Sequence, residues 1–354
     1  MRAVVQTGYG RPSEVLEVRD LHPPSFGDDE VLVRVRAASV HPDVWHVVTG
    51  LPRVLRLMGS GLRRPRDLVP GTDMAGQVES VGAGVTRVRP GDEVFGETIR
   101  GSQWRNGGTY AEYAAVAEDA LVAKPSQVSF EQSATVPTAG LIALANLPEQ
   151  GRTPGQRLLV NGAGGGVGSI AVQLARSWGA HVTAVDHTRK LDLLRALGAD
   201  RVVDYTTDDV THGSGERYDL VFDVVGNHPF SAYRRVLADD GAYVLIGHDQ
   251  FGARGRRWLG TIPRMFGLMS TVIGAEPSLP TRAQAEARST VERRLPRPPF
   301  KMPDRTQSMA RLHGLLKDGA LTPVVARTFP LEQAADAIEL LASGQAVGRI
   351  VVVP

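Results

Sequence analysis

The stretch from 156 to 204 constrains the fold of this chain more than any other part of the sequence. It begins with the apolar segment Gln156–Ala163, passes through a glycine-rich turn, and continues as a segment with the period of an amphipathic helix. A second β-branched segment, His181–Asp186, follows Gly179. A glycine turn between a strand and a helix lets backbone N–H groups approach a pyrophosphate at the positive end of the helix. The order therefore predicts a dinucleotide-binding α/β domain.

The dinucleotide motif is incomplete at Ala163, but Asp186 supports it. Ala163 stands where the first glycine of G-x-G-x-x-G is expected, and Gly165 and Gly168 occupy the other two places. Asp186 follows about 20 residues later, where an acid commonly accepts hydrogen bonds from a ribose. A glycine-rich loop in another kind of α/β protein is the alternative. The strand before, the helix after and the acid downstream together favour the nucleotide site.

Length and composition restrict the remaining possibilities. Single cores stop growing at roughly 250–300 residues, so a chain of 354 residues predicts two domains. The absence of cysteine excludes disulfides, thiolate nucleophiles and cysteine-containing zinc sites. A formal charge of +2 is too small by itself to indicate nucleic acid. With no apolar run of roughly 18 residues and no signal-peptide pattern, we expect a cytoplasmic protein without a membrane or nucleic-acid partner.

Short strands dominate the first third of the chain. Glu30–Ala38 alternates apolar and polar residues, which is typical of a half-buried strand. Gly76–Val81, Asp92–Phe95 and Gly108–Val116 are further strand candidates, and glycine- and proline-rich turns separate them. Frequent short strands of this kind predict a small barrel-like domain.

Helices and apolar strands alternate from Phe130 onward. Two helices separated near Pro137 are predicted first. Asp219–Val225 and Gly241–Gly247 are continuous apolar runs, as in parallel strands buried on both faces. This alternation predicts a doubly wound sheet. The other predicted elements are helices at Pro229–Leu237, Thr306–Leu316 and Leu331–Ser343, an extended segment at Thr322–Phe329 and a strand at Gly348–Val353.

Several longer motifs follow one another in a recognisable order. They are PGTDMAGQVESVGAGVTRVRPGDEVFG at 70–96, GGTYAEYAAV at 107–116, NGAGGGVG at 161–168 and LGADRVVDY at 197–205. With them the chain resembles the medium-chain dehydrogenase/reductase superfamily, in its zinc-free quinone oxidoreductase and enoyl reductase branch. The resemblance implies an α/β protein with a GroES-like, β-barrel-type catalytic domain (1–125 with 322–354) and a doubly wound Rossmann domain (126–321). It implies a homodimer, and it leaves 252–303 as an atypical insertion or lid.

The resemblance also bears on the metal and the reaction. Metal-using members have a Cys where this chain has His41, and Gly-His-Glu where it has Gly71-Thr72-Asp73. We therefore expect no metal, and hydride transfer from NAD(P)H to a small substrate that is already electrophilic, such as an enone, enoyl thioester or quinone. A metal-free alcohol dehydrogenase that uses His41 as a base is one alternative. A nucleotide-binding regulatory protein without turnover is another, because Ile142 stands where many relatives have Thr.

Two groups of residues compete over the 2′ position of the cofactor. Asp186 favours NAD(H), because a carboxylate accepts from the free ribose diol and repels a 2′-phosphate. Thr188, Arg189 and Lys190 favour NADP(H), because a hydroxyl and two cations follow directly after the strand. By resemblance, Tyr205 matches a tyrosine near the adenosine phosphate. We expect NADP(H) to be preferred over NAD(H).

The resemblance also implies roles for individual residues. His41 and Asp43 belong to a loop that the family turns towards the nicotinamide and the substrate. His41 could hydrogen-bond a carbonyl oxygen or supply a proton, or it could only bind the cofactor and fix its own loop. Tyr110 is either a second proton donor or an inward-facing barrel residue. The other expected contacts are Thr138, Gly165, Gly166, Val167, Gly168, Val225, Gly226, Ile246, Gly247 and Arg349 for the cofactor, and Trp45, Trp104 and Phe251 for the substrate.

Overall fold

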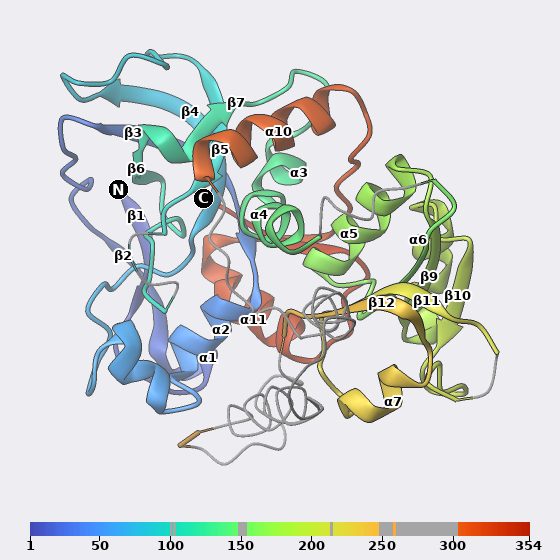
Figure 1. Cartoon of the computed structure of the whole chain (residues 1–354). Coiled ribbons are helices and arrows are strands. Elements are labelled where there is room, and N and C mark those ends of the chain that lie inside the picture. The colour runs from blue at the N-terminus through green and yellow to red at the C-terminus, as the bar shows by residue number, and fades with distance from the viewer. Residues whose placement is uncertain (100, 102–103, 148–153, 213–214, 248–257, 260–303) are drawn as a thin grey trace, which may run out of the picture. The chain divides into compact units, whose positions relative to one another are not determined.

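The computed structural model describes residues 1–99, 101, 104–147, 154–212, 215–247, 258–259 and 304–354 (Figure 1). These residues form two compact units. The first comprises Met1–Leu141 and the described residues of Phe251–Gly260 and Pro303–Pro354, and the second comprises the described residues from Ile142 to Gln250. Phe251 and all of the insertion predicted at 252–303 except 258–259 lie outside the described residues. The domain limits given above stay a prediction.

A seven-stranded sheet is the framework of the first unit. Its order is β13 (Val325–Pro330), β14 (Arg349–Val353), β3 (Glu30–Val40), β4 (Asp73–Val81), β5 (Glu93–Glu97) and β7 (Leu121–Ala123), and β6 (Tyr113–Ala117) pairs with β3. Only β13 and β14 pair in parallel among the described strands of this sheet. A smaller sheet contains β1 (Arg2–Gln6) and β2 (Leu16–Asp20).

The alternating pattern of β3 explains its place in this sheet. Val33 and Val35 are at most 3% exposed, whereas the intervening Arg34 is exposed. Val35 pairs with Gly76 of β4, and a Cβ on Gly76 would meet the carbonyl oxygen of Arg34 at 2.2 Å. The glycine therefore lets the backbones of β3 and β4 approach where a side chain would separate them.

The helices of the first unit follow the predicted pattern with one addition. The break near Pro137 is confirmed, since one helix ends at Ala134 and the next begins at Pro137. The bounds are α1 (Pro12–Val15), α2 (Pro42–Thr49), α3 (Phe130–Ala134), α4 (Pro137–Asn146), α10 (Arg305–Lys317) and α11 (Ala334–Ala342), with a π-helical turn η1 (Arg56–Ser60) and 3-10 turns η2 (Glu118–Ala120) and η4 (Leu331–Gln333).

The second unit contains a five-stranded parallel sheet, which confirms the doubly wound arrangement. Its order is β10 (Arg201–Asp204), β9 (His181–Asp186), β8 (Arg157–Asn161), β11 (Tyr218–Asp223) and β12 (Leu237–Leu245). The helices are α5 (Gly166–Ser177), α6 (Leu191–Ala196) and α7 (Phe230–Arg234), with a 3-10 turn η3 (Thr188–Lys190). The strand order reverses at β8, and ligands of open α/β sheets bind beyond the carboxyl ends of strands at such a point.

Several predicted segments begin or end at other residues in the structure. The strand predicted at Asp219–Val225 ends at Asp223, and the one predicted at Gly241–Gly247 is Leu237–Leu245. The helix predicted at Pro229–Leu237 ends at Arg234, because Tyr218 and Leu237 already pair as strand residues. The strand predicted at Gly108–Val116 begins only at Tyr113. Gly108 has φ of +88°, and this left-handed conformation interrupts the extended chain. No described helix is long and apolar enough to cross a membrane.

Candidate active site

The glycine turn of the second unit connects β8 to α5. Gly162 has φ of +79°, and the N–H groups of Gly162 and Ala163 both donate to Val185 O of β9 at 3.0 Å. Gly165 is the N-cap of α5, and no side chain caps the helix there. The first N–H groups of a helix, here those of Gly166 and the next two residues, have no intrahelical acceptor. Val167 and Gly168 therefore offer donors of the kind that bind a pyrophosphate.

The space around the turn shows which glycines the fold needs. A Cβ on Gly168 would meet Gly162 O at 2.3 Å, which is a backbone clash. A Cβ on Gly165 would meet only Gly162 O, at 3.4 Å, so the turn is open beside Gly165. Ala163 is fully buried, and its methyl group fills the place where the motif usually has glycine. The residues present therefore fit a dinucleotide.

Asp186 ends β9 and fixes the turn. Its carboxylate accepts hydrogen bonds from Gly164 N at 2.7 Å and His187 N at 2.8 Å, and it forms an ion pair with Lys190 Nζ at 3.2 Å. The Asp186 side chain is 7% exposed and that of Lys190 is 13% exposed. The positive charge of Lys190 is thus balanced before any cofactor arrives.

The other residues predicted for the 2′ position also lie beyond the ends of β9 and β10. Thr188 donates a hydrogen bond to the Asp204 carboxylate, which lowers the pKa of that carboxyl to about 2. Arg189 is exposed and contacts the ring of His187, its Nε lying 3.3 Å from Nδ1. Tyr205 is half exposed, with its ring edge-on to His187 at 5.9 Å between centroids. The structure brings the whole predicted set together.

Asp223 organises the ends of β11 and β12. It is fully buried and accepts hydrogen bonds from Gly226 N, Asn161 Nδ2 and Tyr243 Oη, each at 2.8 Å. The Asp223 backbone oxygen accepts from Ile246 N, also at 2.8 Å. The loop with the predicted contacts Val225 and Gly226 is thereby held beside the end of β12. A Cβ on Gly247 would meet Val224 O at 2.0 Å, so the two loops approach too closely for a side chain.

The first unit contains a buried polar cluster that begins at Asp73. This carboxylate is fully buried and accepts from Thr138 Oγ1 at 2.5 Å and from Thr138 N at 3.1 Å, so it caps the first turn of α4. Ser39 Oγ donates to Asp73 Oδ2 at 3.4 Å and accepts from Arg349 Nη2 at 3.2 Å. Burial raises the pKa of Asp73 to about 6, against the hydrogen bonds of Thr138.

Arg349 is the cation of this cluster and stands at the first position of β14. It is 9% exposed, and its Nε is buried without a hydrogen-bond partner among the described residues. Burial lowers its pKa, whereas the nearby Asp73 and Asp43 raise it. A buried guanidinium N–H without an acceptor costs free energy in the folded protein.

The prediction of a loop at His41, Asp43 and Trp45 is wrong for Asp43 and Trp45, because 42–49 forms the helix α2. Pro42 occupies the first turn, where its missing N–H costs nothing, and Gly50 ends the helix with φ of +63°. His41 is the N-cap residue, in extended conformation.

His41 shares a short hydrogen bond with Thr72, whose Oγ1 lies 2.5 Å from Nε2. Its Nδ1 lies 3.7 Å from Asp43 Oδ2. Burial, together with the nearby Arg349, lowers the pKa of His41 to about 3, so the ring is neutral at pH 7. Burial and the nearby Asp73 raise the pKa of Asp43 to about 7. The pair therefore combines a neutral imidazole with a carboxyl group that is partly protonated at pH 7.

Tyr110 is fully buried in the hydrophobic core of the first unit. Its hydroxyl donates to Ser39 O at 3.2 Å, and burial raises the pKa of the phenol above its usual range. This position supports the inward-facing alternative over the role of proton donor.

Trp45 and Trp104, predicted to contact substrate, lie on either side of His46. The centroid of the His46 ring is 5.1 Å from that of Trp45 and 5.7 Å from that of Trp104, with near-perpendicular planes. Both tryptophans are half buried. The structure brings them together in the first unit.

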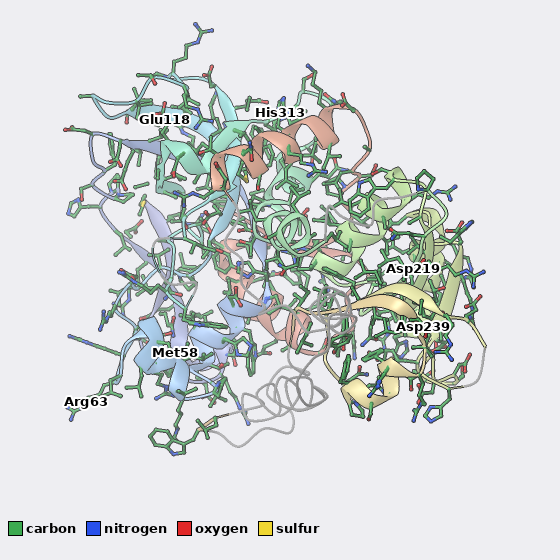
Figure 2. All side chains as sticks on the ribbon, viewed as in Figure 1. Met58, Arg63, Glu118, Asp219, Asp239 and His313 are labelled. Atoms are coloured by element: carbon green, nitrogen blue, oxygen red, sulfur yellow. The ribbon has the colours of Figure 1, made fainter. Side chains whose placement is uncertain are left out.

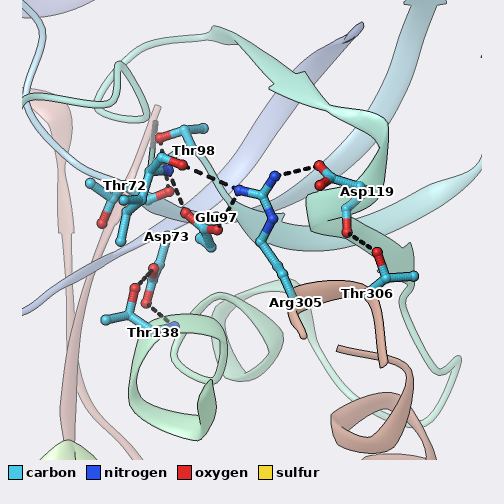
Figure 3. A network of polar contacts seen from close by, with 9 residues as sticks. Thr72, Asp73, Glu97, Thr98, Asp119, Thr138, Arg305 and Thr306 are labelled. Carbon is cyan, nitrogen blue, oxygen red and sulfur yellow. Dashed lines mark hydrogen bonds and ion pairs between the residues drawn. The ribbon is translucent and has the colours of Figure 1, made fainter. Parts of the chain in front are cut away.

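The polar contacts extend from Asp73 to the start of α10 (Figure 3). Thr98 N and Oγ1 donate to Thr72 O at 2.9 and 3.1 Å. Arg305 Nη1 donates to the buried Glu97 at 3.1 Å, and Nη2 donates to Asp119. Burial raises the pKa of Glu97 to about 7, while the N–H of residue 99 and Arg305 oppose the shift. These contacts hold α10 on the sheet of the first unit.

The sequence pattern missed Ser39, Asp73 and Glu97, and it placed Asp223 at the carboxyl end of a strand without its hydrogen-bond partners. Asp73 and Asp223 stand in or beside apolar strand segments, and a carboxylate in such a place must find partners when it is buried. A carboxylate within an apolar strand segment was therefore the sequence signal that could have identified these residues. Their partners, such as Thr138 and Tyr243, are too distant in sequence for a local pattern to identify.

The side chains nearest to His41 include Thr72 and Asp43. A catalytic zinc site needs about three protein ligands. Thr72 and Asp73 stand beside His41, and both Asp73 oxygens are engaged by Thr138 and Ser39. No group of three His, Asp or Glu side chains among the described residues could hold a metal ion.

Comparisons with known proteins agree with both units. Residues 27–126 match the model of the alcohol dehydrogenase GroES-like domain, and residues 197–352 match that of the zinc-binding dehydrogenase family. The chloroplastic quinone-oxidoreductase homolog of Spinacia oleracea is 35% identical over 253 residues, or 69% of this chain and 74% of the relative. The chain belongs to the medium-chain dehydrogenase/reductase superfamily, in its quinone oxidoreductase-like branch.

Two further similarities describe the range of this branch. The chloroplastic NADPH-dependent alkenal/one oxidoreductase of Arabidopsis thaliana is 29% identical over 362 residues, with 100% of this chain and 80% of the relative covered. The crystal structure of an NAD-dependent alcohol dehydrogenase is 30% identical, covers 100% of both chains and has a TM-score of 0.78. The chain described here is an NAD(P)H-dependent oxidoreductase of the quinone oxidoreductase/alkenal reductase type.

Proposed function

We propose that this chain is a zinc-independent reductase that transfers a hydride from NAD(P)H to an enone, enoyl thioester or quinone. The observation that carries the proposal is the donor set at His41, where Thr72 and an already engaged Asp73 replace metal ligands. Without a Lewis acid, an unactivated ketone is difficult to polarise. A carbon conjugated to a carbonyl group accepts a hydride without that help.

The second unit supports cofactor binding through backbone groups. We assign the pyrophosphate to the N–H groups of Gly166, Val167 and Gly168. The loops at 225–226 and 246–247, tied together by Asp223, orient the nicotinamide end. When bound, the cofactor supplies the hydride, and the protein supplies orientation and electrostatics.

His41 and Asp43 have separate tasks in this proposal. Negative charge develops on the carbonyl oxygen of an enone as the hydride reaches the β-carbon, and a neutral imidazole N–H stabilises that oxygen. The proton that completes the reduction comes from the Asp43 carboxyl group, whose pKa of about 7 keeps a large protonated fraction at neutral pH. Asp43 then returns to the acid form by taking a proton from water.

The geometry at Asp186 bears on the choice between NADH and NADPH. The sequence favours NADP(H) because of the cations at Arg189 and Lys190, and that preference stays untested. Lys190 is already paired with Asp186 at 3.2 Å, and Asp204 lies at the end of the adjacent strand. Apart from the Asp186–Lys190 pair, a 2′-phosphate would meet the Asp204 carboxylate and the Arg189 guanidinium, which has no ion pair among the described residues. Because a carboxylate at the position of Asp186 accepts from the free ribose diol and repels a 2′-phosphate, we propose NADH as the preferred cofactor.

The deciding experiment measures oxidation of NADH and NADPH with a quinone, an aliphatic enone and a secondary alcohol, with and without a chelator. We expect enone or quinone turnover that the chelator leaves unchanged. The His41→Ala and Asp43→Asn variants should each lose roughly 10²–10⁴-fold in kcat. Wild-type kcat should decline above pH 7 as Asp43 loses its proton, and Asp43→Asn should lack that decline. Activity that depends on added zinc would refute the proposal.

The same assay tests the two other functions. Oxidation of secondary alcohols without metal, and no enone turnover, would identify a metal-free alcohol dehydrogenase, which the similarity to a solved alcohol dehydrogenase supports. Calorimetric binding of the cofactor without turnover of any electrophile would identify a regulatory protein. The homodimer and the cytoplasmic location stay predictions, to be tested by sedimentation and by cell fractionation.

A further inference from the structure

Large apolar side chains are exposed in one part of the first unit. Seven such side chains are exposed among the described residues. Leu57, Met58 and Leu62 are 53–66% exposed and lie in or just after the turn η1. Trp258 is 61% exposed and Leu259 is 45% exposed. These five side chains are called the apolar patch below.

Backbone contacts join the two segments of the patch. Val54 N donates to Trp258 O at 3.0 Å, and the Arg53 guanidinium lies 5.7 Å from the centre of the Trp258 ring. Gly61 has φ of +113° and donates to Arg56 O at 3.0 Å, so the chain turns tightly between Met58 and Leu62. The patch is therefore a feature of the folded unit.

Arginines surround the apolar patch without acidic partners. Arg63, Arg64 and Arg66 are exposed, Arg53 is half buried, and none of the four has an ion pair among the described residues. Figure 2 labels Met58 and Arg63 at the same end of the first unit. The one acidic residue in 51–68 is Asp67, and its carboxylate pairs with Arg105 at 2.8 Å. Among the described residues, the patch thus carries a positive charge that no ion pair balances.

This combination selects among possible occupants. A second copy on a two-fold axis would face these arginines with the same arginines, and like charges in one interface are unfavourable. An anionic lipid surface satisfies both features, because arginines contact the headgroups while Trp and Leu side chains enter the boundary of the acyl chains. We propose that the apolar patch, with its arginines, docks this protein on the surface of a membrane that contains anionic lipids.

The proposal concerns contact with one leaflet, so it amends the expectation of no membrane partner without requiring a spanning helix. It does not depend on the proposed reaction, because none of these residues belongs to the nucleotide turn or to the cluster around Asp73.

The test measures sedimentation of the intact chain with vesicles of phosphatidylcholine alone and with phosphatidylglycerol added. We expect binding to the anionic vesicles, a decrease with added salt, and weak or no binding to the neutral ones. The Arg63→Glu/Arg64→Glu variant should bind at least about tenfold less tightly. Arg36→Glu is the matched control, since this exposed arginine of β3 lies outside the patch and has no ion pair among the described residues.

A second pair of variants tests insertion of the apolar side chains. Leu57→Ser/Leu62→Ser should weaken binding to anionic vesicles while its circular dichroism and thermal midpoint match the wild type. Binding should shift the tryptophan emission of the wild type to the blue, and Trp258→Tyr should lose most of this shift.

Three outcomes would overturn the proposal. One is equal binding to neutral and anionic vesicles, and another is unchanged binding by the Arg63→Glu/Arg64→Glu variant. The third is no vesicle binding together with dissociation of a wild-type dimer by Leu57→Ser/Leu62→Ser, which would assign the patch to a second copy.

Discussion

The nucleotide turn of the second unit and the polar cluster of the first unit are built in opposite ways. The turn uses consecutive residues from Asn161 to Gly168, and its functional groups are mainly backbone N–H groups at the start of α5. The cluster collects side chains as distant in sequence as Ser39 and Arg349. A site of backbone N–H groups forms once the local turn has formed. A site of side chains that are distant in sequence forms only when the whole unit has folded.

The two sites also handle charge differently. The carboxylate of Asp186 has Lys190 at 3.2 Å and two backbone donors. Asp73 is fully buried with hydroxyl and amide donors, and no described cation lies within ion-pair distance. Burial consequently raises the pKa of Asp73 to about 6 and lowers that of His41 to about 3. In the nucleotide turn the charge of Asp186 is balanced by Lys190. In the polar cluster, burial favours the neutral forms of Asp73 and His41.

The largest expected effect tests that contrast directly. Asp73→Ala should lower the free energy of unfolding by about 3–5 kcal/mol, because it leaves Ser39 Oγ, Thr138 Oγ1 and Thr138 N buried without their acceptor, removes the cap of α4, and takes away one of the two carboxylates near Arg349. Asp186→Ala, the matched change in the second unit, should cost about 1–3 kcal/mol, since Lys190 can reach water. Urea unfolding of both variants measures the difference. Equal losses would show that the two carboxylates are held in the same way.

A smaller effect separates the two glycines of the turn. Gly168→Ala should destabilise the protein by about 1–3 kcal/mol, because the new Cβ meets Gly162 O at 2.3 Å. Gly165→Ala should leave the thermal midpoint of the free protein unchanged but weaken cofactor binding roughly ten- to a hundredfold, by keeping the pyrophosphate from the helix N–H groups. Calorimetry and thermal unfolding together decide this. A stable Gly168→Ala variant that binds cofactor normally would contradict the close packing of the turn.

The third prediction concerns pH and the neutral state of His41. Its pKa is lowered from 6.5 to about 3, so the unfolded chain binds more protons than the folded one between these values. The stability contributed by neutral His41 is present above pH 6.5 and is lost as the pH falls. Relative to His41→Gln, the wild type should lose up to about 1.4 kcal/mol per pH unit below 6.5. The groups that face this ring, Asp43, Thr72 and Arg349, remain in both proteins. Unfolding at pH 7, 6 and 5 measures the difference, and a constant difference would mean that the ring titrates normally.

The smallest effect is expected at an exposed ion pair of the second unit. Arg195 lies 2.6 Å from Asp192, but their side chains are 57% and 98% exposed. Arg195→Ala should change the free energy of unfolding by less than about 0.5 kcal/mol, because water screens such pairs. A loss above about 1 kcal/mol in urea unfolding would contradict this prediction. It would show that exposed ion pairs contribute substantially to the free energy of unfolding of the second unit.

Local patterns predicted much of the fold because the relevant interactions are local. The glycine turn, the break at Pro137 and the ends of β9 all depend on residues a few positions apart. The helix α2 was missed, although Pro42 and Gly50 are ordinary signals for its start and end. The partners of Asp73 could not be predicted, since Thr138 and Ser39 reach it only when β3, β4 and α4 are assembled.

The sequence by itself determined the dinucleotide turn and the strand that precedes it. It also determined that no cysteine can be a metal ligand in this protein. The tertiary structure decided that Lys190 is already balanced by Asp186, that His41 is neutral and that Asp43 keeps a proton near pH 7. The physical reason is that turn geometry follows from neighbouring residues, whereas desolvation and charge compensation depend on which distant groups the folded chain places within a few ångströms.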